Sequence, residues 1–223
     1  MNSSEALQLD SNNMPWTPAS PSGAEQKLLA TATGSDRYTT TLVQLAAGQS
    51  LPAPTNNHGM EAMVLDGDWD LTEGTLTKNG YSRRPPGQVG PSFTKTGCTL
   101  FVKVGPFAPA DQELIHLQTN EHPWLPGQGN LRVKPLHSFE GEGTALVHWP
   151  AGERFMPHKH WGGEEILVLS GTFQDEHGRY PQGTWLRSPH LSAHYPFVEE
   201  ETVIFVKTGH LPGSADEATG SRA

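Results

Sequence analysis

The chain has 223 residues, of which 24 are glycine and 19 are proline, and its formal net charge is −9. The absence of a basic cluster argues against direct binding to nucleic acid, and no apolar run reaches the ~18 residues that a membrane span needs. The single cysteine, Cys98, excludes a disulfide within the chain and fits a reducing compartment. Because the first residues also lack the pattern of a secretory signal, we expect a cytoplasmic protein that contacts neither nucleic acid nor a membrane.

Frequent turn residues and few long helical patterns predict short strands joined by turns. Taken in order, the chain contains similar segments twice. Residues 7–9 and 15–16 match 115–117 and 123–124, residues 41–48 match 145–152, residues 63–69 match 167–173, and residues 101–105 match 205–209. A nearly constant offset over so much of the chain indicates a duplicated domain.

The proline-containing, polar stretch at residues 107–113 marks the boundary between the two repeats. We therefore expect an N-terminal arm at residues 1–4, repeat one at 5–110 and repeat two at 111–213. The polar tail at 214–223 lacks periodicity and is expected to be disordered. Each repeat should form a small antiparallel jelly roll, whose closed or doubled sheet removes exposed edges.

Repeat two contains a histidine-rich stretch with regular spacing. The order is Gly152, five residues, His158, Lys159, His160, three residues, Glu164, six residues and Gly171. His158 and His160 are two residues apart, so on a strand both imidazoles point to one face. Residues 164–169 are typical of a second strand. Two imidazoles and a carboxylate brought together in this way suit a hard-to-borderline divalent metal ion.

These residues carry a family resemblance. The stretch resembles cupin motif one, G(x)5HxH(x)3-4E(x)6G, with every fixed position filled. A second frame resembles motif two, G(x)5PxG(x)2H(x)3N, at Gly183, Pro189 and His194, while Leu191 replaces the inner glycine and Val198 the final asparagine. The sequence of residues 158–185 is also similar to the ChrR-type cupins, relatives of the C-terminal domain of a bacterial anti-sigma factor. The resemblance implies an all-β fold of two tandem cupin barrels, and it implies the metal ligands His158, His160, Glu164 and His194.

The repeat offset tests each of these ligands against its counterpart in repeat one. His158 faces Pro54, His160 faces Asn56, Glu164 faces Met60 and, after a one-residue gap, His194 faces Pro91. Proline and methionine offer no hard donor, and Asn56 is at best a weak carbonyl ligand. We therefore predict a metal-free repeat one and one metal ion per chain. His58 and Glu61 remain nearby and leave a partial site as an alternative.

The comparison also separates two adjacent carboxylates. Glu165 is matched by Glu61 in the repeat that lacks the other ligands, whereas Glu164 is matched by Met60. Strand alternation agrees, because it turns Glu164 to the histidine side and Glu165 away. We favour Glu164 as the ligand.

Aromatic residues surround the predicted site. Trp161 lies between two ligands and Phe155 shortly before them, so we expect both to line a small apolar pocket. His148 could line the same pocket as an outer group. His177, in a predicted hairpin turn, and His190, in a proline-containing loop, are expected to lie in solvent.

Two functions follow from the resemblance, and no catalytic residue is identified for either. The ChrR resemblance implies a metal-binding bicupin that senses a small molecule or an oxidant, a regulatory module of the bacterial stress response. In that family a His- and Cys-rich N-terminal zinc domain holds the sigma factor. This sequence contains no such segment, so we expect no sigma-factor contact of that kind.

The alternative function is a mononuclear non-haem Fe(II) dioxygenase that acts on a β-dicarbonyl or a phenolic ketone, as other cupin dioxygenases do. A closed tetrahedral zinc site would favour the sensing module, and an open octahedral iron site would favour the enzyme. Nickel and manganese are further alternatives. In both cases repeat two would take a small-molecule ligand, and the sequence leaves a homodimer open.

Overall fold

The computed structural model describes residues 5–19, 23–31, 38–54, 58–88, 90–105 and 107–211. The chain forms two compact units: unit one comprises Met14–His122, and unit two comprises Asn2–Asn13 with Pro123–Ala223. Within the described ranges the only helices are two 3₁₀ turns, η1 (Ser11–Asn13) and η2 (Thr119–Glu121), which confirms the all-β prediction. None of the described helices could cross a membrane. The predicted arm at 1–4 and tail at 214–223 lie outside the described residues.

Unit one is built on a large antiparallel sheet in the order β11-β8-β6-β10-β4-β3-β2. These strands are β2 (Thr17–Ala19), β3 (Ala24–Thr31), β4 (Thr39–Leu45), β6 (Gly59–Leu71), β8 (Gly80–Arg84), β10 (Cys98–Gly105) and β11 (Ile115–Gln118). The second half of β6 also pairs with β7 (Gly74–Thr77) and β9 (Ser92–Phe93), and β9 pairs with β5 (Ser50–Leu51). Alternate side chains such as Met60, Ala62 and Val64 enter the core around Trp69.

Unit two has a seven-stranded sheet in the order β1-β19-β16-β21-β14-β13-β12. Its strands are β1 (Leu7–Asp10), β12 (Leu125–Pro126), β13 (Arg132–Phe139), β14 (Glu142–Trp149), β16 (Glu164–Ser170), β19 (Thr184–Ser188) and β21 (Thr202–Thr208). Two further pairs complete the unit: β15 (His158–Lys159) with β20 (Ala193–His194), and β17 (Thr172–Asp175) with β18 (Gly178–Pro181).

The core of unit two contains Ile166 and Val168 of β16 together with Trp149 and Phe173. Because side chains alternate along a strand, Glu164 at the start of β16 shares the inward face of Ile166 and Val168. The strand ends at Ser170, and in the next residue, Gly171, φ is +72° and an added Cβ would lie 2.3 Å from the Glu201 carbonyl oxygen. This close approach explains the glycine that ends motif one.

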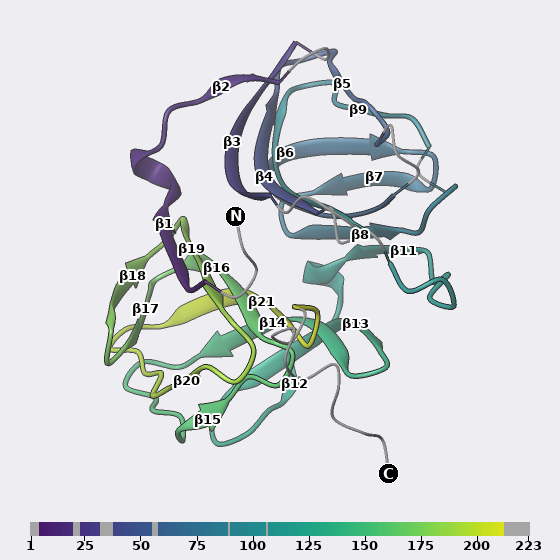
Figure 1. The fold of residues 1–223 in the computed structure, drawn as a ribbon. Helices are drawn as coiled ribbons and strands as arrows, with labels where there is room; N and C mark the ends of the chain where they lie inside the picture. Colours follow the sequence, from purple (N-terminus) through teal and green to yellow (C-terminus); the bar gives the residue numbers. More distant parts are fainter. Residues whose placement is uncertain are drawn as a thin grey trace. The chain divides into compact units, whose positions relative to one another are not determined.

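The two units exchange their first strands, which the sequence repeats did not indicate. Strand β1, at the start of repeat one, pairs antiparallel with β19 in unit two, with Leu9 opposite Trp185 (Figure 1). Strand β11, at the start of repeat two, pairs with β8 in unit one, with Leu117 opposite Tyr81. The compact units therefore differ from residues 5–110 and 111–213 at these strands.

Candidate metal centre

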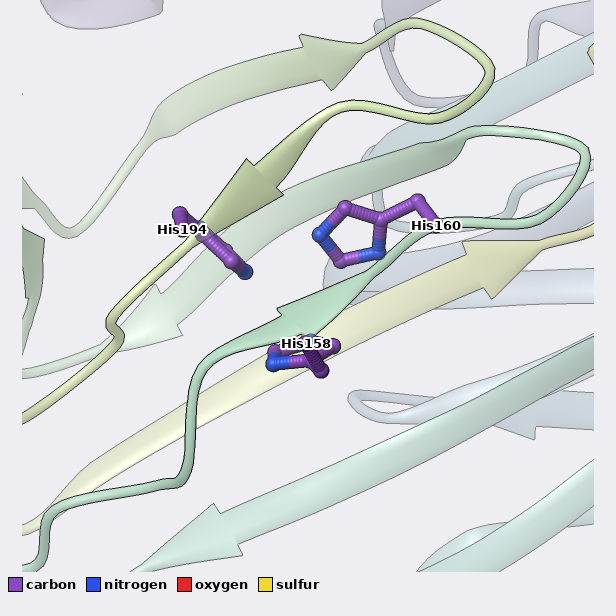
Figure 2. A group of neighbouring side chains, drawn as sticks. All are labelled: His158, His160 and His194. Carbon is purple, nitrogen blue, oxygen red and sulfur yellow. The ribbon is translucent and has the colours of Figure 1, made fainter.

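Local strand pairing brings the three predicted histidine ligands together. In the β15–β20 pair, His158 lies directly opposite His194. The His160 backbone N–H donates to the Ser192 carbonyl at 2.9 Å, which extends the same pairing by one step. His158 and His160 come from one segment of the chain and His194 from its neighbour, and the three rings are turned toward a common space (Figure 2).

Leu191 occupies the motif-two glycine position and keeps a glycine-like backbone. Its φ is +63°, in the left-handed region, and its N–H donates to the His160 carbonyl at 2.9 Å. The substitution of leucine for glycine therefore raises the conformational free energy of the turn and leaves its geometry unchanged. For a residue with a Cβ this increase is about 1–2 kcal/mol.

Replacing Leu191 with glycine should stabilise unit two by roughly 0.5–1 kcal/mol. The variant removes the strain, while the added freedom of the unfolded chain offsets part of the gain. Urea unfolding of Leu191→Gly beside Leu191→Ala measures this difference, since alanine keeps the strain. A glycine variant no more stable than the alanine variant would contradict the assignment of strain to this turn.

The three histidines form a tight and largely buried cluster. Their ligand nitrogens all lie within 4.8 Å of one another. The His160 ring centroid is 4.7 Å from those of both His158 and His194. His160 and His194 are buried and His158 is half-buried. Among the residues that the structure describes, this is the only such group of three or more potential ligands.

Glu164 lies beside the cluster and Glu165 faces elsewhere. One oxygen of Glu164 is 3.6 Å from Nδ1 of His160 and the other is 3.8 Å from Nε2 of His194. Burial raises the pKa of Glu164 to about 7, against the opposing charge of His194. Glu165 instead lies 3.4 Å from Nε2 of His210. The carboxylate favoured from the sequence is thus the one next to the histidines.

Hydrogen bonds fix the ring orientation of two histidines. A carbonyl and a carboxylate can only accept here, so Nδ1 of His158 donates to the Met156 carbonyl at 3.1 Å and Nδ1 of His194 donates to Asp175 at 3.2 Å. In the neutral ring this leaves Nε2 of each imidazole free to bind a metal ion.

The same surroundings shift the pKa values of the histidines. Burial, together with the neighbouring imidazoles of His194 and His158, lowers the pKa of His160 to about 3. Burial also lowers the pKa of His158. For His194 burial acts in the same direction, but the hydrogen bond to Asp175 and the nearby carboxylates outweigh it, so its pKa lies above the ordinary value. Two of the three imidazoles are therefore held in the neutral form that coordinates metals.

Two buried polar atoms of the cluster test whether a metal ion fits. Nε2 of His160 and Oε2 of Glu164 lack a hydrogen bond, although buried polar groups are normally satisfied. A divalent cation among three imidazoles and a carboxylate would satisfy both atoms, and nitrogen with oxygen donors suits zinc or iron. The residues present fit such an ion.

The structure separates the predicted pocket residues. Phe155 packs edge-on against His158, with ring centroids 5.0 Å apart. Trp161 is 76% exposed and lies against His190. His148 lies on the face of β14 opposite Trp149, where it contacts Trp124 and lines a separate groove of about 860 Å³. Its placement there gives no support to an outer role at the metal cluster.

The sequence predicted that two loop histidines lie in solvent. His177 is exposed, as expected for a turn residue. His190 was expected in solvent, but it is half-buried, and its Nδ1 accepts a hydrogen bond from the Gly162 N–H at 2.8 Å. This bond ties the loop that follows His160 to the segment that precedes His194.

Unit one carries different residues at the equivalent positions. The bridge between Asp70 and Phe93 corresponds to that between Gln174 and Phe197, so the counterpart of His194 is Gly90 and not Pro91. Met60 stands where the sequence repeat placed it, because it pairs with Val104 as Glu164 pairs with Thr208, and Asn56 lies outside the described residues. The buried Glu61 accepts a hydrogen bond from the Tyr81 hydroxyl.

A buried arginine occupies this side of unit one. Arg84, fully buried, lies opposite Met60 and donates to the Gly90 carbonyl at 3.2 Å. Its guanidinium also donates to Thr72 at 3.1 Å and forms an ion pair with Glu73. A permanent positive charge therefore contacts the counterpart of His194, which supports the proposal that repeat one holds no metal ion.

Replacing Glu73 with glutamine should destabilise unit one by roughly 1–2 kcal/mol at neutral pH, because Arg84 loses its counter-charge. Burial acts to raise the pKa of Glu73, but hydrogen bonds from its own backbone, Arg84 and Thr72 outweigh it and hold the pKa below 4.5. The stabilisation is therefore present above pH 4.5 and lost as the pH falls through the lower, folded-state pKa.

Urea unfolding of Glu73→Gln at neutral and acidic pH checks this prediction, and the difference from the unchanged protein should shrink in acid. Glu199→Gln is the matched control, since Glu199 and Arg179 form an exposed pair. A difference that is constant with pH would contradict the assigned role of Glu73.

Comparison with protein families gives a match in each of the two repeats. A family model described as "ChrR Cupin-like domain" matches residues 4–108 and again residues 112–212. No match was found among the curated proteins.

Solved structures match over nearly the whole length. A "putative dioxygenase" from Nostoc punctiforme is 16% identical with a TM-score of 0.78, and the match covers 95% of this chain and 85% of the other. The protein YlbA from E. coli is 14% identical with a TM-score of 0.74, covering 96% and 94%. A variant of oxalate decarboxylase from Bacillus subtilis is 10% identical with a TM-score of 0.62, covering 91% and 76%. These similarities show the fold, and the prediction of two tandem barrels of this type is confirmed.

Proposed function

The chain belongs to the ChrR cupin-like family, and from this we propose that it is a metal-binding bicupin that recognises a small molecule in its second repeat, as a sensing or regulatory module. The observation that carries the proposal is the tight group of three imidazole nitrogens within 4.8 Å of one another. His158, His160 and His194 would hold the ion and Glu164 would complete its surroundings. A metal ion held there would supply a Lewis acid or a redox centre.

The residues around the cluster support an apolar ligand. Several exposed large hydrophobic side chains flank the histidines in sequence: Met156, Trp161, Leu191 and Tyr195. Exposed apolar groups gathered near a polar centre are typical of a ligand-binding surface. Behind the cluster, Phe155 and Trp149 pack edge-on with ring centroids 5.9 Å apart, and this packing excludes water from that side of the imidazoles.

A second candidate is a metal-dependent oxygenase that acts on a β-dicarbonyl or a phenolic ketone. One observation favours it: the tight cluster contains the three histidines without Glu164. A site with three protein ligands leaves positions at which substrates can bind. In this reading Glu164, whose pKa burial raises to about 7, could hold or release a proton at its carboxylate near neutral pH.

Metal analysis of anaerobically purified protein, followed by oxygen uptake with acetylacetone after iron loading, separates the two. One tightly bound zinc per chain without oxygen uptake would support the sensing module. Uptake that depends on both iron and the diketone would instead support the oxygenase. Protein that binds no divalent metal stoichiometrically would contradict both functions, and two ions per chain would contradict the metal-free repeat one.

A further inference from the structure

Asp175 is the one carboxylate hydrogen-bonded to the histidine cluster among the described residues, and no motif position predicts it. It ends β17, and its side chain is buried, with an exposure of 6%. Its Oδ1 accepts hydrogen bonds from the Tyr180 hydroxyl at 2.8 Å and from the backbone N–H groups of His177 and Gly178 at 2.8 and 3.0 Å. Its Oδ2 accepts from Nδ1 of His194 at 3.2 Å. The two oxygens therefore serve different partners.

The contact with Oδ2 determines which ring nitrogen of His194 carries the hydrogen. An ionised carboxylate has no proton to donate, so Nδ1 of His194 carries the hydrogen. Its Nε2 is then free of hydrogen in the neutral ring and lies on the Glu164 side, 3.8 Å from that carboxylate. We propose that Asp175 is a positioning residue that fixes the tautomer and the ring orientation of His194 and so strengthens its binding of the metal ion. This inference rests on the proposed metal site.

Comparison of the two units shows whether Asp175 is needed to close its own hairpin or acts on His194. Asp175 pairs with Gly178 across its hairpin, and the equivalent pair in unit one is Leu71 with Gly74. The hairpin of unit one thus closes with leucine at the Asp175 position, so the turn does not require the carboxylate. Gly90 stands at the His194 position in the same unit. The carboxylate and the histidine that it contacts are both absent there.

The hydroxyl that supports Asp175 follows the same pattern. Tyr180 lies opposite Phe173 in the β17–β18 pair, and the residue equivalent to it in unit one is the buried Leu76, opposite Trp69. A connected series of Tyr180, Asp175 and His194 in unit two is replaced by apolar side chains and glycine in unit one. Carboxylates that accept the second ring N–H of a ligating histidine raise its basicity and hold its orientation.

The test is Asp175→Asn, with affinity measured by competition between the protein and a chromophoric zinc chelator. We expect zinc affinity to fall by roughly 10- to 100-fold, as for other such partners of metal-binding histidines, and the Co(II) absorption spectrum to change. Asp175→Glu should recover part of the affinity. Glu176→Gln is the matched control, because Glu176 is the next residue and accepts from the Tyr195 backbone N–H instead of a ligand.

A second measurement does not depend on metal binding. Long-range proton–nitrogen NMR of the metal-free protein at mildly alkaline pH should show the hydrogen of His194 on Nδ1 in the unchanged chain and partly on Nε2 in Asp175→Asn. A folded Asp175→Asn variant with unchanged zinc affinity and unchanged tautomer would overturn the inference. If the unchanged protein binds no metal ion, the proposed function fails, while the tautomer measurement still reports on the Asp175 contact.

Discussion

Replacement of His160 with alanine is expected to lower metal affinity about a hundredfold, so that the purified protein no longer retains one ion per chain, while unit two stays folded. His160 is the most deeply buried of the three histidines, at 5% exposure, and its Nε2 lacks a hydrogen bond. Structural zinc sites with four ligands are worth about 10–16 kcal/mol, so one ligand accounts for roughly 3 kcal/mol or a hundredfold in affinity. Removal of a buried imidazole that makes no hydrogen bond through Nε2 should cost little else.

Metal content by elemental analysis and thermal melting with and without chelator check this prediction. A ligand present at 100 times its dissociation constant stabilises a fold by about 2.7 kcal/mol, so chelator should lower the melting temperature of the unchanged protein and not that of His160→Ala. His177→Ala is the control, since its side chain is exposed and lies outside the cluster. Full metal content in folded His160→Ala would contradict the assigned ligand set.

Leu9→Pro is expected to weaken unit two by roughly 1–3 kcal/mol, the cost of leaving a ladder acceptor without its donor, and to reduce its metal affinity. The Ser11 N–H donates to the Gly183 carbonyl, and hydrogen-bonded pairs alternate along an antiparallel ladder. Leu9 and Trp185 therefore also exchange hydrogen bonds, which proline removes at its own nitrogen. Strand β19 next to it pairs in turn with β16, where Glu164 lies opposite Ser188.

The duplication supplies the control for this prediction. Leu117→Pro makes the equivalent change in β11, which pairs with β8 of unit one. Hydrogen exchange measured by mass spectrometry should show loss of protection at β19 for Leu9→Pro and at β8 for Leu117→Pro. Zinc affinity should fall only for the first variant. Equal effects of both variants on the metal site would contradict the assignment of β1 to the sheet that carries Glu164.

The fold and the metal cluster were predictable because their residues follow fixed spacings. His158 and His160 share one strand face by alternation, and Glu164 differs from Glu165 in the same way. Asp175 was harder to find, because its contact with His194 is made through tertiary structure and no motif includes it. The contrast with Leu71 in repeat one is the sequence signal that could have identified it.

Other features depended on information that spacing does not contain. Residues 7–9 and 115–117 are equivalent in the two repeats, so either could pair with β8 or with β19 without any change in hydrophobic pattern. The counterpart of His194 required the paired positions of Phe93 and Phe197, which identify Gly90. Arg84 is a charged residue on a predicted strand, and only the structure shows that it is buried with Glu73.

The exchange of first strands also constrains the order in which the two units can fold during synthesis. Strand β1 leaves the ribosome first, but its partner β19 begins only at Thr184. Unit one can complete its sheet once β11 has emerged. The sheet of unit two needs β1, which is synthesised before unit one. A gene cut at the repeat boundary would give each half the edge strand of the other. A shortened chain that keeps every strand of the seven-stranded sheet must contain residues 7–10 as well as residues 125–208.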